Sequence, residues 1–422
     1  MSGLIIAAPS SGSGKTTITL ALLRLLTREG VSVRGAKSGP DYIDPRFHEA
    51  ACGAPCPNLD AWAMTPERIR DLAAGDGLLI IEGAMGLFDG APPDGRGAVA
   101  DLARNLALPV VLVVDAGRMA GSVAPLVAGF AAHDPNVRLA GVILNSVGSD
   151  RHETMLRRAL APLGLPVLAA LRRDAGLKQP SRHLGLVQAE ERPDLEAFLN
   201  RAADALATTL DRKALMSLAV PLPHEGGAPR QDPPAQVIAV ARDRAFAFAY
   251  PHLLEDWKAA GAELRFFSPL ADEPVPEAGF VFLPGGYPEL HAATLAAASH
   301  FMSSLRKASL VADIYGECGG YMVLGEGLKD AEGTDHAMAG LLGLETSFAE
   351  RHLHLGYRHL TPLTGPFKAA LKGHEFHYAS TLRAEGAPLF AARDAEGVAL
   401  PDMGLAKGRV YGSFAHLIDT AQ

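Results

Sequence analysis

The chain opens with a short apolar run that leads directly into a glycine-rich loop. Residues 4–8 (Leu-Ile-Ile-Ala-Ala) are followed by Pro9-Ser-Ser-Gly-Ser-Gly-Lys-Thr-Thr17, and a helical pattern covers residues 16–28. In a strand–loop–helix arrangement of this kind, glycines let backbone N–H groups close around phosphates, and the helix N-terminus adds partial positive charge. We therefore expect a first β-strand that ends in a phosphate-binding loop.

Two residues of this loop carry the predicted chemistry. Lys15 should reach the terminal phosphates of a nucleotide, and the Thr16 hydroxyl should hold Mg²⁺. Pro9 stands where the strict motif has glycine, and Ser10 stands where partitioning-type ATPases carry a second lysine. The alternative is a glycine-rich turn with an incidental lysine, and the strand–loop–helix context speaks against it. The predicted ATP-binding residues of the loop are Gly12, Ser13, Gly14, Lys15, Thr16 and Thr17.

Further apolar runs alternate with helical stretches along the chain, which is typical of a buried, mostly parallel sheet with helices on both faces. The expected strands of the first half are residues 4–8, 31–36, 78–81, 110–114 and 139–144, and a second series begins at residues 237–241. A segment rich in proline and glycine separates the two series. With 422 residues, the chain is too long for one core. We predict an α/β protein with domains over residues 1–212 and 236–422, joined by a linker over residues 213–235.

Acidic residues follow two of the expected strands. Asp41 and Asp44 lie in Gly39-Pro-Asp-Tyr-Ile-Asp-Pro45, while Glu82 and Asp89 lie in Glu82-Gly-Ala-Met-Gly-Leu-Phe-Asp-Gly90. Ligands of open α/β sheets collect beyond the carboxyl ends of the strands, so these acids should face the bound phosphates. Mg²⁺ prefers such oxygen ligands, although any single loop acid could simply be solvated. We predict Thr16, Asp41 and Glu82 as metal ligands, and Asn145 as a residue that contacts adenine.

A second motif lies far downstream. The strand-like run 310–315 leads into Gly316-Glu-Cys-Gly-Gly320, and a helical pattern follows, which is the layout of a nucleophile elbow with cysteine in place of serine. The thiol needs a base, for which we prefer His416 over its rivals His374 and His377. The expected donors of an oxyanion hole are Gly285, Gly286 and Gly319. A buried structural cysteine is the alternative.

Bulk properties narrow the range of functions. The net charge of −8 and the absence of a basic stripe argue against nucleic-acid or anionic-membrane binding. The apolar run 106–114 is too short to cross a bilayer and contains Pro109. The chain has only three cysteines. We therefore do not expect a disulfide framework, and we expect a cytoplasmic location. Cys52 and Cys56 lack the partners of a tetrahedral metal site, and the histidine-rich stretch 351–354 is typical of a solvated segment.

Taken together, these motifs resemble the cobyrinic and hydrogenobyrinic acid a,c-diamide synthases of corrin biosynthesis over essentially the whole chain. The resemblance is carried by the phosphate loop and both acidic loops already quoted, and also by Arg182-His-Leu-Gly-Leu-Val187 and Leu283-Pro-Gly-Gly-Tyr-Pro-Glu-Leu290. It implies a dethiobiotin-synthetase-like P-loop domain over residues 1–212. It also implies a class I, flavodoxin-like glutamine amidotransferase domain of the triad type over residues 236–422.

The resemblance further implies a glutamine-hydrolysing carbon–nitrogen ligase of cobalamin biosynthesis. Cys318, activated by His416, would release ammonia from glutamine, and the ammonia would travel inside the protein to the synthetase site. There ATP would phosphorylate the a and c acetate carboxylates of hydrogenobyrinic acid in turn, and ammonia would displace the phosphate. Asp41, Asp44, Glu82 and Asp89 fall on metal-, ATP- and substrate-handling positions of the family. The cations expected to meet the corrin polycarboxylate are Lys37, Arg46 and Arg182.

One position departs from the family pattern. Triad amidotransferases carry a glutamate two residues after the histidine, where this chain has Ile418, so the third member of the Cys–His set is left open. The substrate alternatives are cobalt-containing cobyrinic acid and another tetrapyrrole, such as a nickel sirohydrochlorin. A different class of function would be a regulatory P-loop ATPase with a degenerate amidotransferase module. A homodimer is left open as well.

Overall fold

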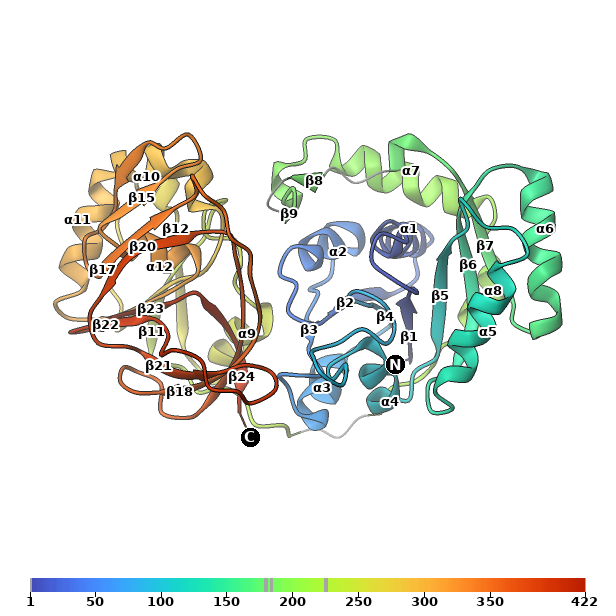
Figure 1. The fold of residues 1–422 in the computed structure, drawn as a ribbon, viewed down its shortest axis with the longest axis horizontal. Coiled ribbons are helices and arrows are strands. Elements are labelled where there is room, and N and C mark those ends of the chain that lie inside the picture. Colours follow the sequence, from blue (N-terminus) through green and yellow to red (C-terminus); the bar gives the residue numbers. More distant parts are fainter. Residues whose placement is uncertain (1, 178–180, 183–184, 224–226, 422) are drawn as a thin grey trace. The chain divides into compact units, whose positions relative to one another are not determined.

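The computed structural model describes residues 2–177, 181–182, 185–223 and 227–421 and divides the chain into two compact units, residues 1–228 and 229–422 (Figure 1). Within these residues, no helix combines the length and the apolar character that crossing a membrane requires.

The first unit is built on a sheet with strand order β3-β2-β4-β1-β5-β6-β7, in which every neighbouring pair is parallel. The central strands β1, β4 and β5 are almost wholly buried, as expected of a parallel sheet covered on both faces. The strands are β1 (Ser2–Ala7), β2 (Val33–Ser38), β3 (Asn58–Leu59), β4 (Leu78–Glu82), β5 (Val110–Asp115), β6 (Leu139–Val147) and β7 (Val167–Arg172). A short separate ribbon pairs β8 (Ser181–Arg182) with β9 (Gly185–Leu186).

Helices connect these strands, and α1 packs against both α2 and α7. α1 begins at Lys15, directly after the phosphate loop, and presents a row of buried leucines to the sheet. The helices of this unit are α1 (Lys15–Arg28), α2 (Asp44–Cys52), α3 (Pro66–Ala73), α4 (Val99–Leu106), α5 (Val123–His133), α6 (Asp150–Leu160), α7 (Leu195–Ala207) and α8 (Arg212–Leu218), with short 3₁₀ turns η1 (Ala161–Leu163), η2 (Ala175–Leu177) and η3 (Ala189–Glu191). The phosphate loop and the acidic loops after β2 and β4 thus lie at the carboxyl edge of one sheet.

Part of the segment expected to be a linker has regular structure. α8 buries Leu215, and β10 (Val220–Pro221) pairs antiparallel with β1. These contacts bind residues 212–221 to the first unit, because an apolar side chain and two backbone positions are removed from water. The predicted division into residues 1–212, 213–235 and 236–422 stays a prediction.

The second unit has a central sheet of order β12-β11-β13-β14-β23-β22, which is parallel except for β22 at its edge. Its strands are β11 (Val237–Ala241), β12 (Glu263–Phe267), β13 (Phe280–Leu283), β14 (Asp313–Glu317), β22 (Leu405–Lys407) and β23 (Val410–Ser413). The helices are α9 (Pro251–Ala259), α10 (Ala292–Ala297), α11 (Ser299–Ala308) and α12 (Gly319–Leu324), with 3₁₀ turns η4 (Pro269–Ala271) and η5 (Pro288–His291). The predicted α/β class with a parallel sheet is confirmed in both units.

Two small, mainly antiparallel sheets complete this unit. One has the order β16-β15-β17-β20, and the other has the order β21-β18-β19-β24. Their strands are β15 (Gly327–Lys329), β16 (Asp335–Ala337), β17 (Gly343–Ser347), β18 (His354–Pro362), β19 (Leu371–His377), β20 (Ser380–Glu385), β21 (Phe390–Arg393) and β24 (Ala415–Thr420). β24 follows β23 after one residue, so the last two strands carry the chain from the central sheet into the second small sheet.

Candidate active site

The phosphate loop has the backbone that its glycines predict. Gly12 and Gly14 have φ angles of 78° and 93°, a region that residues with a Cβ rarely adopt. The Lys15 ammonium donates hydrogen bonds to the carbonyl oxygens of Ser10 at 3.1 Å and Met85 at 2.5 Å. Burial lowers the pKa of Lys15 to about 8, although neighbouring carboxylates favour the charged form. In this structure the Lys15 ammonium is thus bound by two uncharged backbone carbonyl oxygens.

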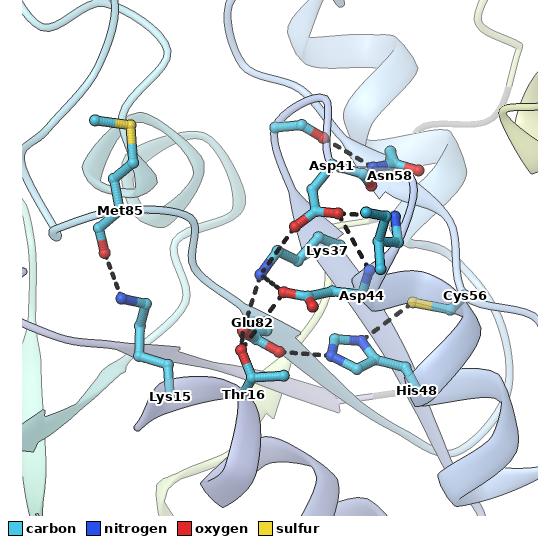
Figure 2. A network of polar contacts seen from close by, with 12 residues as sticks. Lys15, Thr16, Lys37, Asp41, Asp44, His48, Cys56, Asn58, Glu82 and Met85 are labelled. Atoms are coloured by element: carbon cyan, nitrogen blue, oxygen red, sulfur yellow. Dashed lines mark hydrogen bonds and ion pairs between the residues drawn. The ribbon is translucent and has the colours of Figure 1, made fainter. Parts of the chain in front are cut away.

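Next to the loop, Thr16 joins a buried carboxylate cluster, which Figure 2 shows around Lys37. The Thr16 hydroxyl donates to Glu82 Oε1 at 2.5 Å and lies 3.5 Å from Asp44 Oδ2. Glu82 is the last residue of β4 and is completely buried, whereas Asp44 begins α2 and is 3% exposed. Residues at the ends of three separate elements, α1, β4 and α2, therefore meet beside the phosphate-binding loop.

Lys37 neutralises this cluster. Its ammonium lies 2.5 Å from Asp44 Oδ2, 2.8 Å from Glu82 Oε1 and 3.8 Å from an Asp41 oxygen. Burial would lower the pKa of Lys37, but the three carboxylates outweigh it and raise that pKa above its usual value. With its side chain 4% exposed, Lys37 holds the acids together in this structure, and its contact with a substrate stays a prediction.

A second set of contacts holds the other carboxylate oxygen of Glu82, Oε2. His48 Nε2–H donates to Glu82 Oε2 at 2.6 Å, and the Cys56 thiol lies 3.3 Å from His48 Nδ1 (Figure 2). Burial raises the pKa of Glu82, but Lys37 and His48 more than offset this, so the pKa lies well below its usual range. Cys52 donates to the His48 carbonyl at 3.2 Å. Both cysteines therefore support the helix that carries Asp44 and His48.

The loop between β2 and α2 is held in shape by hydrogen bonds of two side chains, Asn58 and Asp41. The Asn58 amide donates to the carbonyls of Gly39 at 2.9 Å and Asp41 at 2.6 Å. Asp41 Oδ1 accepts the N–H groups of Ile43 at 2.8 Å and Asp44 at 3.1 Å. The Asp41 side chain caps the start of α2 in this way while its other oxygen faces Lys37.

The donor set of this cluster fits a hard cation. It offers one hydroxyl oxygen and carboxylate oxygens from three acids, which are the ligands Mg²⁺ prefers. Asp44 Oδ1 is buried without a hydrogen-bond partner among the described residues. Burial and the neighbouring Asp41 raise the pKa of Asp44 well above its usual value, so a cation beside it would relieve an unfavourable charge.

Other predicted residues of this unit make contacts of their own outside the cluster. Asp89 Oδ2 accepts the Gly86 N–H at 2.9 Å and so closes its own turn. The Asn145 amide donates to the Ser13 carbonyl at 3.0 Å, which braces the phosphate loop from β6. Arg46 is one third exposed and pairs with Glu49 at 2.8 Å. Arg182 lies in β8, and its side chain is outside the described residues.

In the second unit, Cys318 lies between β14 and α12 with φ 46° and ψ −105°. Such a conformation is strained for a residue with a side chain, as is typical of a nucleophile elbow. The neighbouring glycines leave no room for side chains, since a Cβ on Gly320 would lie 2.0 Å from the Leu283 carbonyl oxygen. The structure therefore has the sharp turn that the glycine pattern predicts.

His416 is the histidine that approaches this turn. A Cβ built on Gly285 would lie 3.0 Å from His416 Nε2 and 3.3 Å from Cys318 Cβ, so the ring, the glycine and the thiol-bearing residue meet at one point. His377 instead binds Glu375 at 3.0 Å and stacks on Phe414. His374 pairs across the sheet with His416 and packs against Tyr357.

The glycines proposed for the oxyanion hole are in mutual contact. A Cβ on Gly319 would lie 3.0 Å from the Gly286 backbone nitrogen, and a Cβ on Gly286 would lie 2.0 Å from the Ala245 carbonyl oxygen. Two backbone segments thus approach each other closely beside the thiol, which only residues without side chains permit.

Burial keeps the thiol and the imidazole uncharged. It raises the pKa of Cys318 above its usual value, and the nearby Glu289 carboxyl adds to the effect. Burial, together with His374 and His377, lowers the pKa of His416 to about 3. The resting thiol and imidazole are therefore both neutral, and a neutral imidazole is the form that can accept a proton.

One further cluster of possible metal ligands lies on β18 and β19. Ligand atoms of His354, Glu375 and His377 lie within 4.8 Å of one another. Both Glu375 oxygens are already engaged, however, because Arg358 binds Oε2 at 2.7 Å and His377 binds Oε1 at 3.0 Å. We interpret the group as a buried ion cluster, in keeping with the non-metal interpretation of this histidine-rich region.

Two residues of these sites did not emerge from the sequence. His48 lies four residues after Asp44 and so on the same face of α2, a spacing that could have pointed to it. Glu317 directly precedes the nucleophile in a buried strand, and a charged residue at such a position was the available signal.

Each of the two units matches a known family model. Residues 4–187 match the family model described as the CobQ/CobB/MinD/ParA nucleotide binding domain. Residues 237–422 match the model described as the CobB/CobQ-like glutamine amidotransferase domain. These two matches agree with the phosphate loop in the first unit and the cysteine elbow in the second.

Curated relatives match over the full length. The hydrogenobyrinate a,c-diamide synthase of Brucella anthropi is 57% identical over 431 residues, which cover 99% of this chain and 99% of that protein. The protein of the same name from Rhizobium meliloti is 57% identical, with 100% of each chain covered. That of Rhodobacter capsulatus is 54% identical and covers 99% of this chain and 98% of its own.

Proposed function

The chain belongs to the hydrogenobyrinate a,c-diamide synthases, and we propose that its two candidate sites carry out the two halves of one glutamine-dependent amidation. The observation that carries this proposal is the presence, in one chain, of a phosphate loop beside a carboxylate cluster and of a strained cysteine elbow beside a buried histidine. The family membership confirms the resemblance drawn from the motifs. The alternative of a regulatory ATPase finds no support, because the full-length relatives are named as synthases.

In the glutaminase half, His416 takes the proton of the Cys318 thiol, and the resulting thiolate attacks the side-chain amide carbon of glutamine. The carbonyl oxygen gains negative charge, for which the backbone N–H groups of Gly286 and Gly319 are the proposed donors. The imidazolium returns its proton to the amide nitrogen, the C–N bond breaks, and ammonia leaves a thioester. Water then hydrolyses the thioester to glutamate and restores the thiol.

In the synthetase half, an acetate carboxylate oxygen of the corrin attacks the γ-phosphorus of ATP, and ADP leaves. Ammonia attacks the carbonyl carbon of the acyl phosphate, phosphate departs, and a proton is lost to leave the amide. Lys15 is proposed to exchange its two carbonyl partners for phosphate oxygens as charge develops on them. Asp89 is proposed to keep the glycine turn after β4 in shape beside this site.

We further propose that the synthetase site works with Mg²⁺, held by Thr16, Glu82 and the acids of the β2–α2 loop. The support is the oxygen donor set and the buried, unpartnered Asp44 Oδ1. When bound, the ion would neutralise phosphate charge and polarise the γ-phosphoryl group. Lys37 already balances part of the negative charge of these acids, so the cluster can exist in a folded protein before any ion binds.

The proposed substrate is the metal-free corrin, and its two acetates are amidated in turn because one phosphate-transfer site positions one carboxylate at a time. Turnover of purified protein with hydrogenobyrinic acid and with cobyrinic acid tests this choice. Turnover of the cobalt corrin alone would refute the choice of substrate while leaving the chemistry intact. A homodimer stays a prediction, to be tested by the mass of the protein in solution.

The experiment that tests the division of labour is Cys318→Ser. The variant should lose glutamine-dependent amidation and keep ammonia-dependent amidation within about twofold, because the thiol takes no part in acyl phosphate formation. Product amide is measured by mass with each nitrogen donor. Equal loss with both donors would contradict the proposal.

A further inference from the structure

We propose that Glu317 is the carboxylate that positions His416, and so takes the place of the glutamate that triad amidotransferases carry two residues after the histidine. This inference rests on the proposed roles of Cys318 and His416. It assigns a function to the residue directly before the nucleophile.

The distances place the carboxyl group at the imidazole. Glu317 Oε2 lies 3.7 Å from His416 Nδ1, and Glu317 Oε1 accepts the N–H of Leu417 at 3.1 Å. The side chains of the pair are 2% and 0% exposed, so water does not compete for the carboxyl group. One oxygen is thus tied to the backbone next to the histidine while the other faces the ring. Catalytic hydrogen bonds are often long in the absence of substrate, and 3.7 Å is within the reach of such a contact.

Strand pairing explains why these residues meet. Glu317 ends β14 and is the register partner of Ser413 in β23. The Cys318 N–H also donates to the Ser413 carbonyl at 2.8 Å. Three residues after Ser413, the chain has entered β24 and presents His416. The parallel pair β14 and β23 therefore holds the residue before the nucleophile, and the strand that directly follows β23 carries the histidine.

The position used by other triad enzymes is filled differently here. Ile418 is completely buried and apolar, and its carbonyl oxygen lies 2.8 Å from His252 Nε2. Glu375, another buried acid of this region, is held by Arg358 and His377. Within the described part of the chain, Glu317 makes no ion pair other than that with His416, whose Nδ1 lies 3.7 Å from Glu317 Oε2.

Ionised Glu317 is the form that can stabilise a protonated His416. Burial raises the pKa of Glu317 to about 8, although the Leu417 N–H and the Tyr315 hydroxyl favour its ionised form. The groups acting on His416 from the surrounding strands are His374, His377 and the Phe248 backbone. When the thiol proton moves to His416 Nε2, the ring becomes a cation whose Nδ1 lies 3.7 Å from Glu317 Oε2. Glu317 that is ionised before the transfer then stabilises the imidazolium, so the thiol proton is the only proton that moves in this step.

Glu317→Gln tests the inference. The amide oxygen can still accept from the Leu417 N–H, so the fold should persist, but the negative charge is gone. We expect kcat/KM for glutamine to fall about 100- to 10,000-fold, because the carboxylate that orients a catalytic histidine contributes on this scale. Most of the loss should lie in kcat, and ammonia-dependent amidation should stay within about twofold. Glu332→Gln, which removes an exposed carboxylate of the same unit, is the matched control.

Two further measurements separate positioning from a structural role. Glu317→Asp keeps the charge, and its kcat/KM for glutamine should be at least tenfold higher than that of Glu317→Gln. If Glu317 only filled space, the shorter aspartate would not restore activity. Alkylation of Cys318 by iodoacetamide, followed across pH by mass analysis, reports thiolate formation without glutamine. Its pH midpoint should rise in Glu317→Gln relative to the parent protein.

The outcomes are distinct. A Glu317→Gln variant that keeps glutaminase activity within twofold, or that loses ammonia-dependent activity to the same extent, would overturn the inference. Failure of the proposed function would appear elsewhere, as loss of ammonia-dependent activity in Cys318→Ser. The two proposals can therefore fail separately.

Discussion

The strongest quantitative expectation concerns Lys37, whose ammonium is enclosed by the carboxylates of the first unit. Replacing it with methionine keeps most of the side-chain volume and removes the charge. Asp44 and Glu82, at 3% and 0% exposure, are then left as neighbouring buried acids with no ammonium between them. Breaking a buried ion pair by removing one partner costs about 3–5 kcal/mol of folding free energy, because an uncompensated charge stays buried.

The loss should depend on pH in a defined direction. In the parent protein, the pKa of Glu82 is lowered, so its contribution to stability is present above the unfolded value near 4.3 and is constant from pH 5 to 8. The raised pKa of Lys37 keeps its charge through the same range. Without Lys37, the carboxylate pKa values rise, and protonation relieves the repulsion as the pH falls. Lys37→Met should therefore be most destabilising at pH 8 and less so at pH 5.

The assay uses the placement of the two tryptophans of the chain. Trp62 lies in the first unit and Trp257 in the second, and both are buried. In a Trp257→Phe background, Trp62 fluorescence follows unfolding of the first unit in the intact chain. For a unit of this size, 3–5 kcal/mol corresponds to a fall in Tm of about 6–20 °C.

Two controls make the result decisive. Lys213→Met removes an exposed lysine from α8 of the same unit and should change the stability by less than about 0.5 kcal/mol. Adding Asp44→Asn to Lys37→Met should restore part of the loss, because it removes one of the stranded charges. A Lys37→Met protein within 1 kcal/mol of its parent at both pH values would refute the argument.

Three other outcomes are expected. Lys15→Ala and Glu82→Gln should lower amidation at least about 100-fold with either glutamine or ammonia, as measured by ADP release, and a normal ammonia-dependent rate in either variant would rule out its assigned role. Gly320→Ala should cost about 1–3 kcal/mol in thermal unfolding and remove glutaminase activity, whereas Gly327→Ala, whose added Cβ meets nothing closer than 3.8 Å, should do neither. Early time points under limiting ATP should contain a monoamide by mass analysis, and a diamide without any monoamide would contradict sequential amidation.

Much of both sites could be predicted from the sequence because their defining motifs are local. The phosphate loop needs a strand, glycines and a helix within a few residues, and the elbow at Cys318 needs the same elements in the same order. Parallel strands then bring the loops after β2 and β4 to one edge of the sheet, so the convergence of Asp44 and Glu82 followed from topology.

The unpredicted parts depend on which charges pair in three dimensions. Lys37 was predicted to contact a substrate, whereas its ion pairs with Asp44 of α2 and Glu82 of β4 were not predicted. Glu317 was overlooked because the family pattern directed attention to position 418, whereas the pairing of β14 with β23 brings the acid beside His416 by another route. Asn145 was expected at the adenine, and its bond to Ser13 depends on a close approach between β6 and the phosphate loop.

The burial of Cys318 has a consequence for chemical damage. Peroxides and other oxidants attack thiolates, and continued oxidation beyond the sulfenic acid cannot ordinarily be reversed. Because burial and nearby acids raise the pKa of this thiol, it stays protonated between turnovers and is a poor target. In the proposed mechanism, the reactive sulfur anion forms near neutral pH mainly during turnover, when the thiol proton moves to His416 and glutamine is bound. The low reactivity of the resting thiol should therefore extend the working life of the protein under oxidative conditions.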